Sequence, residues 1–296
     1  MNESIFIKLG ISYRKDERMS AHTSFKIGGV ADYFALPKNK DELKNLILAA
    51  RKEGVKYTIL GNGSNILCDD CGYRGIVIST LNMKEIKLID STKIFAEAGA
   101  SLTAVCLFAK KHSLKGLEFA YGIPGSVGGA LYMNAGAYGG EMKQVVESAI
   151  SLDKNLNEKE RGKDELSFSY RNSVYTNSNE IITGVVFSLG MGEPSEINEK
   201  METLMAKRKA SQPLEFGSAG STFKRPVGYF AAALIDECGL KGLSVGDAEV
   251  SQKHAGFVIN KGAATCADVL NLIDEIKRVV LDKKGVALET EVIYLR

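Results

Sequence analysis

The chain has 296 residues, a length that predicts about two domains at the usual ~100–200 residues per domain. Hydrophobic residues make up 45% of it and charged residues 25%, so it has the composition of a globular protein whose core needs no disulfide bonds. A formal net charge of +2 argues against a nucleic-acid-binding surface and against a polybasic membrane signal.

Nothing in the sequence predicts export or membrane insertion. The opening MNESIFIKLG carries Glu3 where a signal peptide would be apolar, and no window approaches the ~18 apolar residues of a membrane span. The five cysteines form an odd set, which is typical of reduced thiols in the cytosol. Cys68 and Cys71 form a CxxC pair without a second pair or a nearby histidine, so we expect no metal site. We therefore expect a cytoplasmic protein.

The first half of the chain mixes predicted helices and strands. A helix is expected over residues 39–53, where four apolar side chains follow the i, i+3, i+4, i+7 spacing. Ser101 is a typical N-cap for a second helix over 101–116, which Gly116 would end. Apolar runs predict strands over 57–60, 75–80 and 93–100.

The second half continues the mixture and ends on a strand. The helix that opens at Pro194 would bury one apolar face and finish in the basic cluster KRK at 207–209. Since strands and helices do not alternate strictly, the predicted fold class is α+β. A domain boundary is expected near 190–200, where MGEPSE interrupts the pattern. The expected elements are strands over 145–153, 180–190 and 288–295, and helices over 194–209, 230–238 and 265–285. Thr265 is expected to cap the last of these helices and Gly285 to end it.

The segment ILGNGSNIL is the first with a recognisable chemistry. A strand runs into Gly61, Asn62, Gly63, Ser64 and Asn65. Glycine lets successive N–H groups turn toward one point, which suits a phosphate or pyrophosphate, and the serine and second asparagine add side-chain donors. The alternative is an ordinary tight turn after a strand. The segment is neither a Walker loop nor a Rossmann fingerprint, so we expect a dinucleotide to be held in another manner.

A second glycine-rich segment follows at residues 116–140, which contain eight glycines. Gly125, Gly128 and Gly129 keep side chains away from a surface that something flat or bulky approaches. Ser126 is suited to cap a helix whose N-terminus faces an anion. The alternative is a crowded packing crossover. Together, the two segments favour a nucleotide cofactor.

Two later segments present reactive side chains on turns. FSYRNS places Arg171 next to Tyr170, and an arginine is suited to clamp a carboxylate, although alone it is more often a surface ion-pair residue. SAGSTFKRP places Ser221 after a glycine, with Lys224 and Arg225 close behind. A lone serine in such a place is usually a turn residue.

Taken in order, these segments resemble one enzyme family. GNGSN, YGIPGSVGGALYMNAGAYGGE, SYRNS, QPLEFGSAGSTFKRP, GLKGLSVGDAEVSQKHAGFVIN and LETEV have the order and spacing of UDP-N-acetylenolpyruvoylglucosamine reductases. The similarity runs from TSFKIGG at 23–29 to the last strand, which is nearly the whole chain. The extra tyrosine-bearing loop of the longer form is missing, so the chain resembles the shorter type.

The resemblance implies a fold and a reaction. An α+β FAD-binding portion of the vanillyl-alcohol-oxidase (PCMH) type would span residues 1–195, in two halves split near 80. A substrate domain would span 196–296, with its last strand returning to the N-terminal part. The implied activity uses NADPH and FAD to reduce the enolpyruvyl group of UDP-N-acetylglucosamine enolpyruvate to UDP-N-acetylmuramate, in peptidoglycan precursor synthesis. The FAD, held non-covalently, would contact Gly61, Asn62, Gly63, Ser64, Asn65, Gly122, Ile123, Pro124, Gly125, Ser126, Gly128 and Gly129.

Three catalytic residues are also implied. Arg171 and Glu291 would hold the substrate carboxylate, and Ser221 would give the proton that completes the reduction. Substrate contacts are expected from Tyr170, Lys224, Arg225 and Lys253. Cations for the diphosphate would come from among Arg208, Arg225, Lys241 and Lys253, for which the alternative is a solvated surface.

The chain departs from the family pattern at a few positions. His22 stands where an asparagine is common, and Ala233 where a lysine is often found, which weakens the expectation of substrate contacts from that helix. Cys68 and Cys71 lie in an otherwise matching loop. His254 is near the implied substrate site, but a structural role fits it equally well.

Two other functions stay open. The first is another oxidase of the same flavin fold, acting on a small alcohol; the three histidines lie outside the glycine loops, which argues against histidyl attachment of the flavin. The second is a nucleotide-sugar-binding regulator without turnover, against which the presence of Arg171, Ser221 and Glu291 argues. The sequence gives no oligomeric state.

Overall fold

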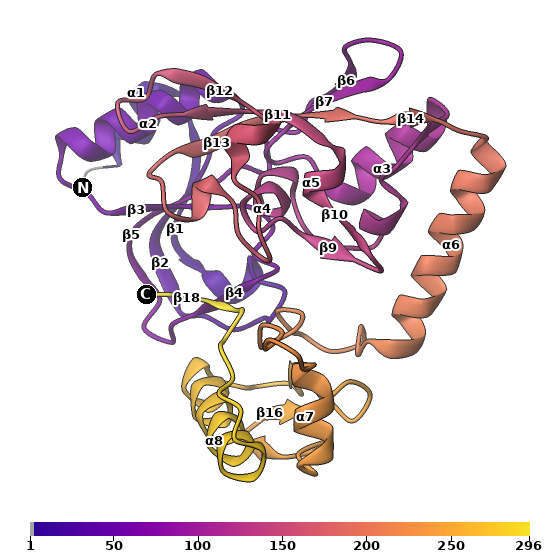
Figure 1. The fold of residues 1–296 in the computed structure, drawn as a ribbon. Helices are drawn as coiled ribbons and strands as arrows, with labels where there is room; N and C mark the ends of the chain where they lie inside the picture. The colour runs from indigo at the N-terminus through magenta and orange to yellow at the C-terminus, as the bar shows by residue number, and fades with distance from the viewer. Residues whose placement is uncertain (1–2) are drawn as a thin grey trace. The chain divides into compact units, whose positions relative to one another are not determined.

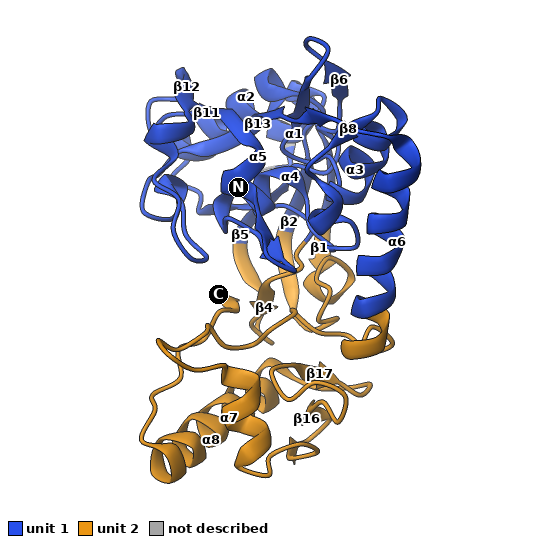
Figure 2. Ribbon diagram, turned by 45° about the vertical axis from the view of Figure 1, so that its right-hand side comes forward, with its two compact units in different colours: residues 1–14, 33–62, 75–208 blue, residues 15–32, 63–74, 209–296 orange. Residues whose placement is uncertain are grey.

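The structure, a computed structural model, describes residues 3–296 (Figure 1). The chain forms two compact units, each made of three stretches (Figure 2). Unit 1 comprises residues 1–14, 33–62 and 75–208, and unit 2 comprises residues 15–32, 63–74 and 209–296. The predicted boundary at 195 falls within the first turn of a continuous helix, α6 (Pro194–Ser211). The predicted domain division therefore differs from the division into these two compact units and stays a prediction.

Antiparallel strands form the larger sheet of unit 1. Its order is β12-β11-β13-β7-β6, and the predicted strands over 93–100, 145–153 and 180–190 all lie in it. The helices α3 (Leu102–Lys111) and α4 (Val127–Tyr132) contribute to the same hydrophobic core. The strand bounds are β6 Ile86–Leu88, β7 Lys93–Glu97, β11 Val146–Leu152, β12 Glu158–Gly162 and β13 Ile181–Ser188.

A second core in unit 1 surrounds the predicted first helix. Asn39 caps α2 (Lys40–Lys52) by accepting a hydrogen bond from the N–H of Glu42 at 2.9 Å, and the predicted apolar face of the helix is buried. The strands β3 and β5 pair in parallel, within a sheet of order β1-β2-β5-β3. The other bounds are α1 Ser4–Leu9, β1 Ser12–Arg18, β2 Val30–Leu36, β3 Tyr57–Leu60 and β5 Tyr73–Ser79.

Unit 2 packs two helices and a small sheet around its own core. The predicted caps of the long helix are confirmed: Thr265 accepts from the N–H of Asp268 at 3.0 Å, and Gly285 ends the helix with φ +67°. Two strands far apart in sequence, β4 and β18, pair in parallel. The bounds are β4 Ile66–Cys68, α7 Ala231–Glu237, β15 Ser244–Val245, β16 Ala248–Val250, β17 Val258–Asn260, α8 Cys266–Lys284 and β18 Ile293–Leu295.

Two predicted elements are wrong in extent. The helix expected over 101–116 ends at Lys111, because Ser113 has a left-handed backbone with φ +58° that turns the chain into β8. The strand expected over 288–295 is formed only by its last three residues before Arg296. The remaining short elements are η1 Met19–Ala21, β8 Leu114–Lys115, η2 Glu118–Ala120, β9 Gly136–Ala137, β10 Gly140–Glu141, α5 Met142–Val145, η3 Lys163–Leu166, η4 Val174–Thr176 and β14 Gly190–Met191.

The α+β class is confirmed, since helices and largely antiparallel sheets share each core. Over residues 3–296, no helix has the length and apolar character needed to cross a bilayer. All five cysteines are free thiols; Cys68 is buried and Cys71 is exposed.

Candidate active site

Unit 1 brings part of the first predicted loop against the second. The side-chain amide of Asn62 donates a hydrogen bond to the carbonyl of Pro124 at 2.7 Å. A Cβ on Gly61 would lie 2.3 Å from Ser126 Oγ, closer than a real Cβ approaches, so only glycine fits there. Two loops about 60 residues apart in the chain thus meet directly.

Ser126 caps α4 as predicted, accepting from the N–H of Gly129 at 3.4 Å. Gly122 has φ +86°, and a Cβ on it would lie 2.6 Å from Met205 Cε of α6. A Cβ on Gly128 would lie 2.9 Å from Ala98 Cβ. The alternative interpretation of this segment, a crowded packing crossover, therefore accounts for two of its glycines.

The chemistry of the two loops fits a flavin dinucleotide. Glycine backbone, an asparagine amide and a capping serine hydroxyl stand together in unit 1, and these are groups that bind a pyrophosphate. Ile123 and Pro124 add apolar surface to the same turn. The individual contacts to FAD stay predictions.

The remainder of the first loop lies in unit 2. Gly63 has φ +61°, and its carbonyl accepts from the N–H of Ser24 at 3.2 Å. The amide side chain of Asn65 donates to the carbonyl of Glu291 at 3.2 Å. Asn65, which was predicted to contact the cofactor, thus holds the backbone of Glu291, a predicted catalytic residue. Ser64 is half-buried. His22, the departure from the family pattern, lies 2.7 Å from Glu17.

Arg171 lies in unit 1 on a strained turn. Its φ is +52°, a left-handed conformation that an arginine rarely adopts, and Ser169 and Asn172 exchange backbone hydrogen bonds around it at 3.1 and 3.2 Å. The guanidinium lies 5.0 Å from the ring centroid of Tyr170 and 3.5 Å from the carbonyl of Gly136. Backbone strain at a polar residue is typical of functional sites, so the geometry favours a role for this arginine.

Ser221 and Glu291 lie in unit 2, and their backbones are neighbours. The N–H of Glu291 donates to the carbonyl of Thr222 at 2.8 Å, and the N–H of Lys224 donates to the carbonyl of Glu289 at 2.8 Å. The segment that was predicted as the start of the last strand therefore runs beside the Ser221 turn. Ser221 itself is half-exposed, and Gly220 before it has φ +78°.

The predicted substrate residues of unit 2 already have partners in the protein. Lys224 pairs with the carboxylate of Glu289, and Lys253 Nζ donates to the carbonyl of Lys209 at 2.7 Å. The guanidinium of Arg225 lies 4.6 Å from the ring centroid of Phe230, on an exposed loop. Lys241, a diphosphate candidate, pairs with Asp236 at 2.6 Å.

Arg208 is a residue whose burial the sequence did not predict. It belongs to the KRK cluster, yet its residue is only 7% exposed, and its guanidinium lies 5.8 Å from the ring centroid of Tyr138. Burial lowers the pKa of the guanidinium.

In unit 2, burial similarly lowers the pKa of His254, whose Nδ1 accepts from the N–H of Gly256 at 3.1 Å. These contacts support the structural interpretation of the histidine.

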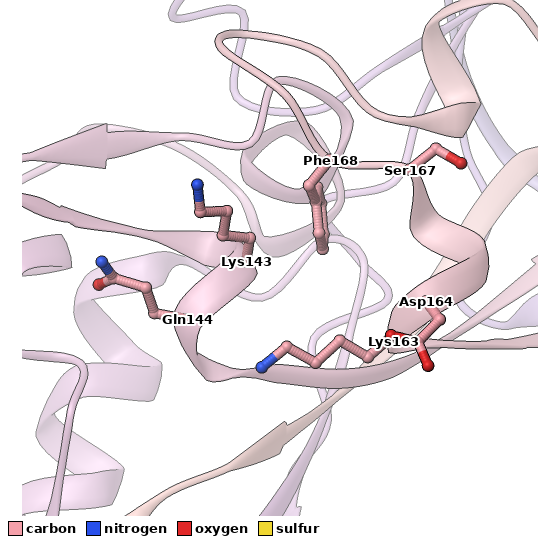
Figure 3. A pocket seen from close by; sticks show the side chains of 6 residues that line it. All are labelled: Lys143, Gln144, Lys163, Asp164, Ser167 and Phe168. Carbon is pink, nitrogen blue, oxygen red and sulfur yellow. The ribbon is translucent and has the colours of Figure 1, made fainter.

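A pocket of unit 1 was also not predicted (Figure 3). Lys143 and Gln144 come from α5, and the lining residues from η3 stand opposite them around the opening (Figure 3). None of the described lining residues is a predicted site residue, although the last of them lies only two residues before Tyr170. The lining comprises Lys143, Gln144, Lys163, Asp164, Ser167 and Phe168.

Two family models match separate regions of the chain. Residues 31–154 match the model of an FAD-binding domain family, and residues 212–295 match the model of the C-terminal domain of UDP-N-acetylenolpyruvoylglucosamine reductase. The first match covers both glycine segments up to β11, and the second covers Ser221 and Glu291.

Whole-chain relatives agree with the domain matches. UDP-N-acetylenolpyruvoylglucosamine reductase of Caldanaerobacter subterraneus is 51% identical over 277 residues, covering 94% of this chain and 91% of the relative. The enzyme of the same name from Clostridium novyi is 49% identical, covering 93% and 89%. The crystal structure of UDP-N-acetylenolpyruvylglucosamine reductase from Thermus caldophilus superposes with a TM-score of 0.81 at 34% identity, covering 97% of this chain and 99% of that one.

Proposed function

The chain belongs to the UDP-N-acetylenolpyruvoylglucosamine reductase family, an FAD-dependent oxidoreductase of peptidoglycan synthesis, and from this premise we propose its reaction in detail. It uses NADPH to reduce the enolpyruvyl group of UDP-N-acetylglucosamine enolpyruvate and releases UDP-N-acetylmuramate. Since both substrates are intracellular metabolites, we also propose a cytoplasmic location. When bound, FAD carries the hydride from NADPH to the terminal vinyl carbon of the substrate.

Arg171 acts on the substrate carboxylate. As the vinyl carbon gains a hydride, negative charge develops on the carbon next to the carboxylate and spreads into it. A guanidinium stabilises that charge with two parallel hydrogen bonds, and its fixed orientation costs nothing at the moment of reaction. The strained turn at φ +52° fixes where the Arg171 side chain begins. Glu291 acts on the same carboxylate as a protonated hydrogen-bond donor, because an ionised side chain would repel the developing negative charge.

Ser221 gives the proton that completes the reduction. A serine hydroxyl is a poor acid near neutral pH, but the carbanion next to the carboxylate is a strong base, so the transfer is feasible. Lys224 lies three residues further along, although its ammonium pairs with Glu289. Tyr170, Arg225 and Lys253 are proposed to contact the UDP-sugar.

One observation carries the assignment of unit 2. Ser221 and Glu291 are 70 residues apart in sequence, yet the Glu291 N–H donates to the carbonyl of the residue next to Ser221 at 2.8 Å. The turn that carries Ser221 is thus tied to Glu291 by a backbone hydrogen bond from Glu291 to the neighbouring Thr222.

The test uses the purified holoenzyme under anaerobic conditions. NADPH should bleach the visible absorbance of the flavin, and UDP-N-acetylglucosamine enolpyruvate should restore it with formation of UDP-N-acetylmuramate. An oxidase of small alcohols would bleach with the alcohol instead of NADPH, and a regulator would bind the UDP-sugar without restoring the colour. Either result would contradict the proposal.

The placement of FAD is tested at Gly61. In Gly61→Ala the new Cβ would meet Ser126 Oγ, and moving that hydroxyl would break the α4 cap, so the two loops should separate and flavin content should fall. Gly162→Ala is the matched control, because its nearest neighbour is Glu165 Oε2 at 3.9 Å. Gly61→Ala protein that copurifies with the full flavin content of the control would show that the loops do not hold the cofactor.

A further inference from the structure

Thr222, which no motif singled out, is the most densely bonded residue of the Ser221 turn. Its N–H donates to the carbonyl of Gly256 at 2.8 Å, and its carbonyl accepts from the N–H of Glu291 at 2.8 Å. Its hydroxyl Oγ1 accepts from the N–H of Val258 at 3.0 Å. The residue is 1% exposed, so these three bonds are shielded from water.

The two sides of Ser221 are held very differently. Gly220, directly before it, has φ +78°, and nothing lies within 4 Å of where its Cβ would be; the nearest anchor on this side is Ser218, whose N–H donates to the carbonyl of Ser24 at 3.1 Å. Thr222, after it, is tied to two other segments of unit 2. The anchor nearest to Ser221 is therefore the residue on its C-terminal side.

The Thr222 hydroxyl completes the edge of a sheet. β17 is the last strand in the order β15-β16-β17, and the segment 217–222 runs along it. The N–H of Asn260 donates to the carbonyl of Gly217 at 2.8 Å, and the N–H of Val258 donates to the Thr222 side chain. Without that hydroxyl, a buried N–H would lose its acceptor, and the segment would shift to recover one.

We propose that Thr222 is a positioning residue for proton transfer: its hydroxyl anchors the turn on β17 while its carbonyl ties the same turn to Glu291. The inference rests on the proposed roles of Ser221 and Glu291. It predicts that the hydroxyl of Thr222, which touches no substrate, matters for the proton-transfer half of the reaction alone.

The experiment compares both half-reactions by stopped-flow absorbance in the holoenzyme. Thr222→Val keeps the shape and removes the acceptor, and Thr222→Ser keeps the acceptor. A displacement of about 1 Å can cost 10²-fold, so Thr222→Val should slow flavin reoxidation by substrate by roughly 10- to 100-fold. Its reduction by NADPH should stay within about twofold, and Thr222→Ser should reoxidise at nearly the native rate. Should the valine variant fail to fold, Thr222→Ala replaces it with the same expectation.

Two controls separate positioning from general destabilisation. Thr265→Val also removes a hydroxyl that accepts a backbone N–H in unit 2, at the start of α8, and it should lower the melting temperature without changing either half-reaction. In Ser221→Ala, adding Thr222→Val should slow reoxidation by a smaller factor than it does alone, because one of the two groups being positioned is already gone.

The outcomes are distinct. Native reoxidation in Thr222→Val, equal slowing of both half-reactions, or slowing in Thr222→Ser as large as in Thr222→Val would each overturn the positioning role. Additive effects in the double variant would do the same. If Ser221→Ala itself reoxidises normally, the proposed function of Ser221 fails, and that failure is recognised independently of any Thr222 variant.

Discussion

Arg171 and Ser221 both lie on turns with a left-handed backbone, but the two turns place the strain differently. In the first, the arginine itself has φ +52°. In the second, Gly220 takes the positive φ of +78°, which costs a glycine little, and leaves Ser221 free of it. In the first turn the backbone strain is therefore at Arg171 itself. In the second turn the left-handed residue is Gly220, and Thr222 keeps the turn rigid.

The largest expected effect is at Ser221. Loss of a positioned acid typically costs 10²–10⁴-fold, so Ser221→Ala should bleach with NADPH at nearly the native rate and reoxidise with substrate at least ~100-fold more slowly. Ser221→Cys, which keeps a donor, should recover part of the loss. Stopped-flow absorbance separates the two steps. Unchanged reoxidation in Ser221→Ala would show that Ser221 is not the proton donor, and the comparison of the two turns would then no longer concern two functional residues.

Arg171 should show a smaller loss in the same half-reaction. Lysine keeps the charge but not the bidentate geometry, and a hydrogen bond to a charged group contributes about 1.5–3 kcal/mol, so Arg171→Lys should keep its flavin and reoxidise roughly 10- to 100-fold more slowly. A variant that loses FAD but turns over normally after reconstitution would assign this arginine to the cofactor.

Arg171→Gly tests where the strain lies. Glycine relieves a left-handed cost of roughly 1–2 kcal/mol but loses about 0.5–1 kcal/mol in chain entropy. The free energy of unfolding in urea should therefore stay within about 1 kcal/mol of native, while reoxidation is slowed at least as much as in Arg171→Lys. A large loss of stability would show that the arginine is structural.

Acid should weaken the Glu180 contact of unit 1 but not the Thr222 bonds of unit 2. Hydrogen bonds from Arg161, at 2.9 and 2.5 Å, lower the pKa of Glu180 in unit 1 from its ordinary 4.5. Since the folded-state pKa is depressed, the stabilisation is complete above about pH 4.5 and is lost as pH falls through the folded value. Glu180→Gln should cost about 1–2 kcal/mol near pH 7 and progressively less toward pH 3, as measured by urea unfolding. A cost independent of pH would contradict this. The bonds of Thr222 involve neutral groups and do not titrate.

The smallest expected effect is at Gly220. Nothing obstructs a Cβ there, so Gly220→Ala should pay only the left-handed backbone cost, about 1 kcal/mol of unfolding free energy after the entropy gain. Thermal or urea denaturation measures it. A loss several times larger would show that the turn is tightly packed at Gly220, which would contradict the contrast between the two turns.

Local features of the fold were predictable from sequence, and non-local ones were not. Ser101, Ser126 and Thr265 all cap helices as expected, because a cap depends on a side chain and an N–H three residues away. The helix after Ser101 was predicted too long, because propensity does not signal a left-handed serine.

For the candidate site, too, local motifs were predictable from sequence and non-local contacts were not. Motif order located Arg171, Ser221 and Glu291, whose proposed roles stay predictions. The burial of Arg208 was not predictable, since a KRK cluster is usually solvated. No sequence pattern singles out Thr222, because its partners lie 34, 36 and 69 residues away. Such long-range pairing leaves no periodic pattern in a single sequence.

The three-part construction of unit 2 has a consequence during synthesis. Its core combines Phe25 and Ile27 with Leu67 and with residues from 219 onward. A ribosome adds about 5–20 residues per second, so the first of these side chains wait on the order of ten seconds or longer for their partners to be translated. Over that interval the nascent chain presents unpaired apolar segments, so we expect unit 2 to depend on chaperones that bind emerging polypeptides.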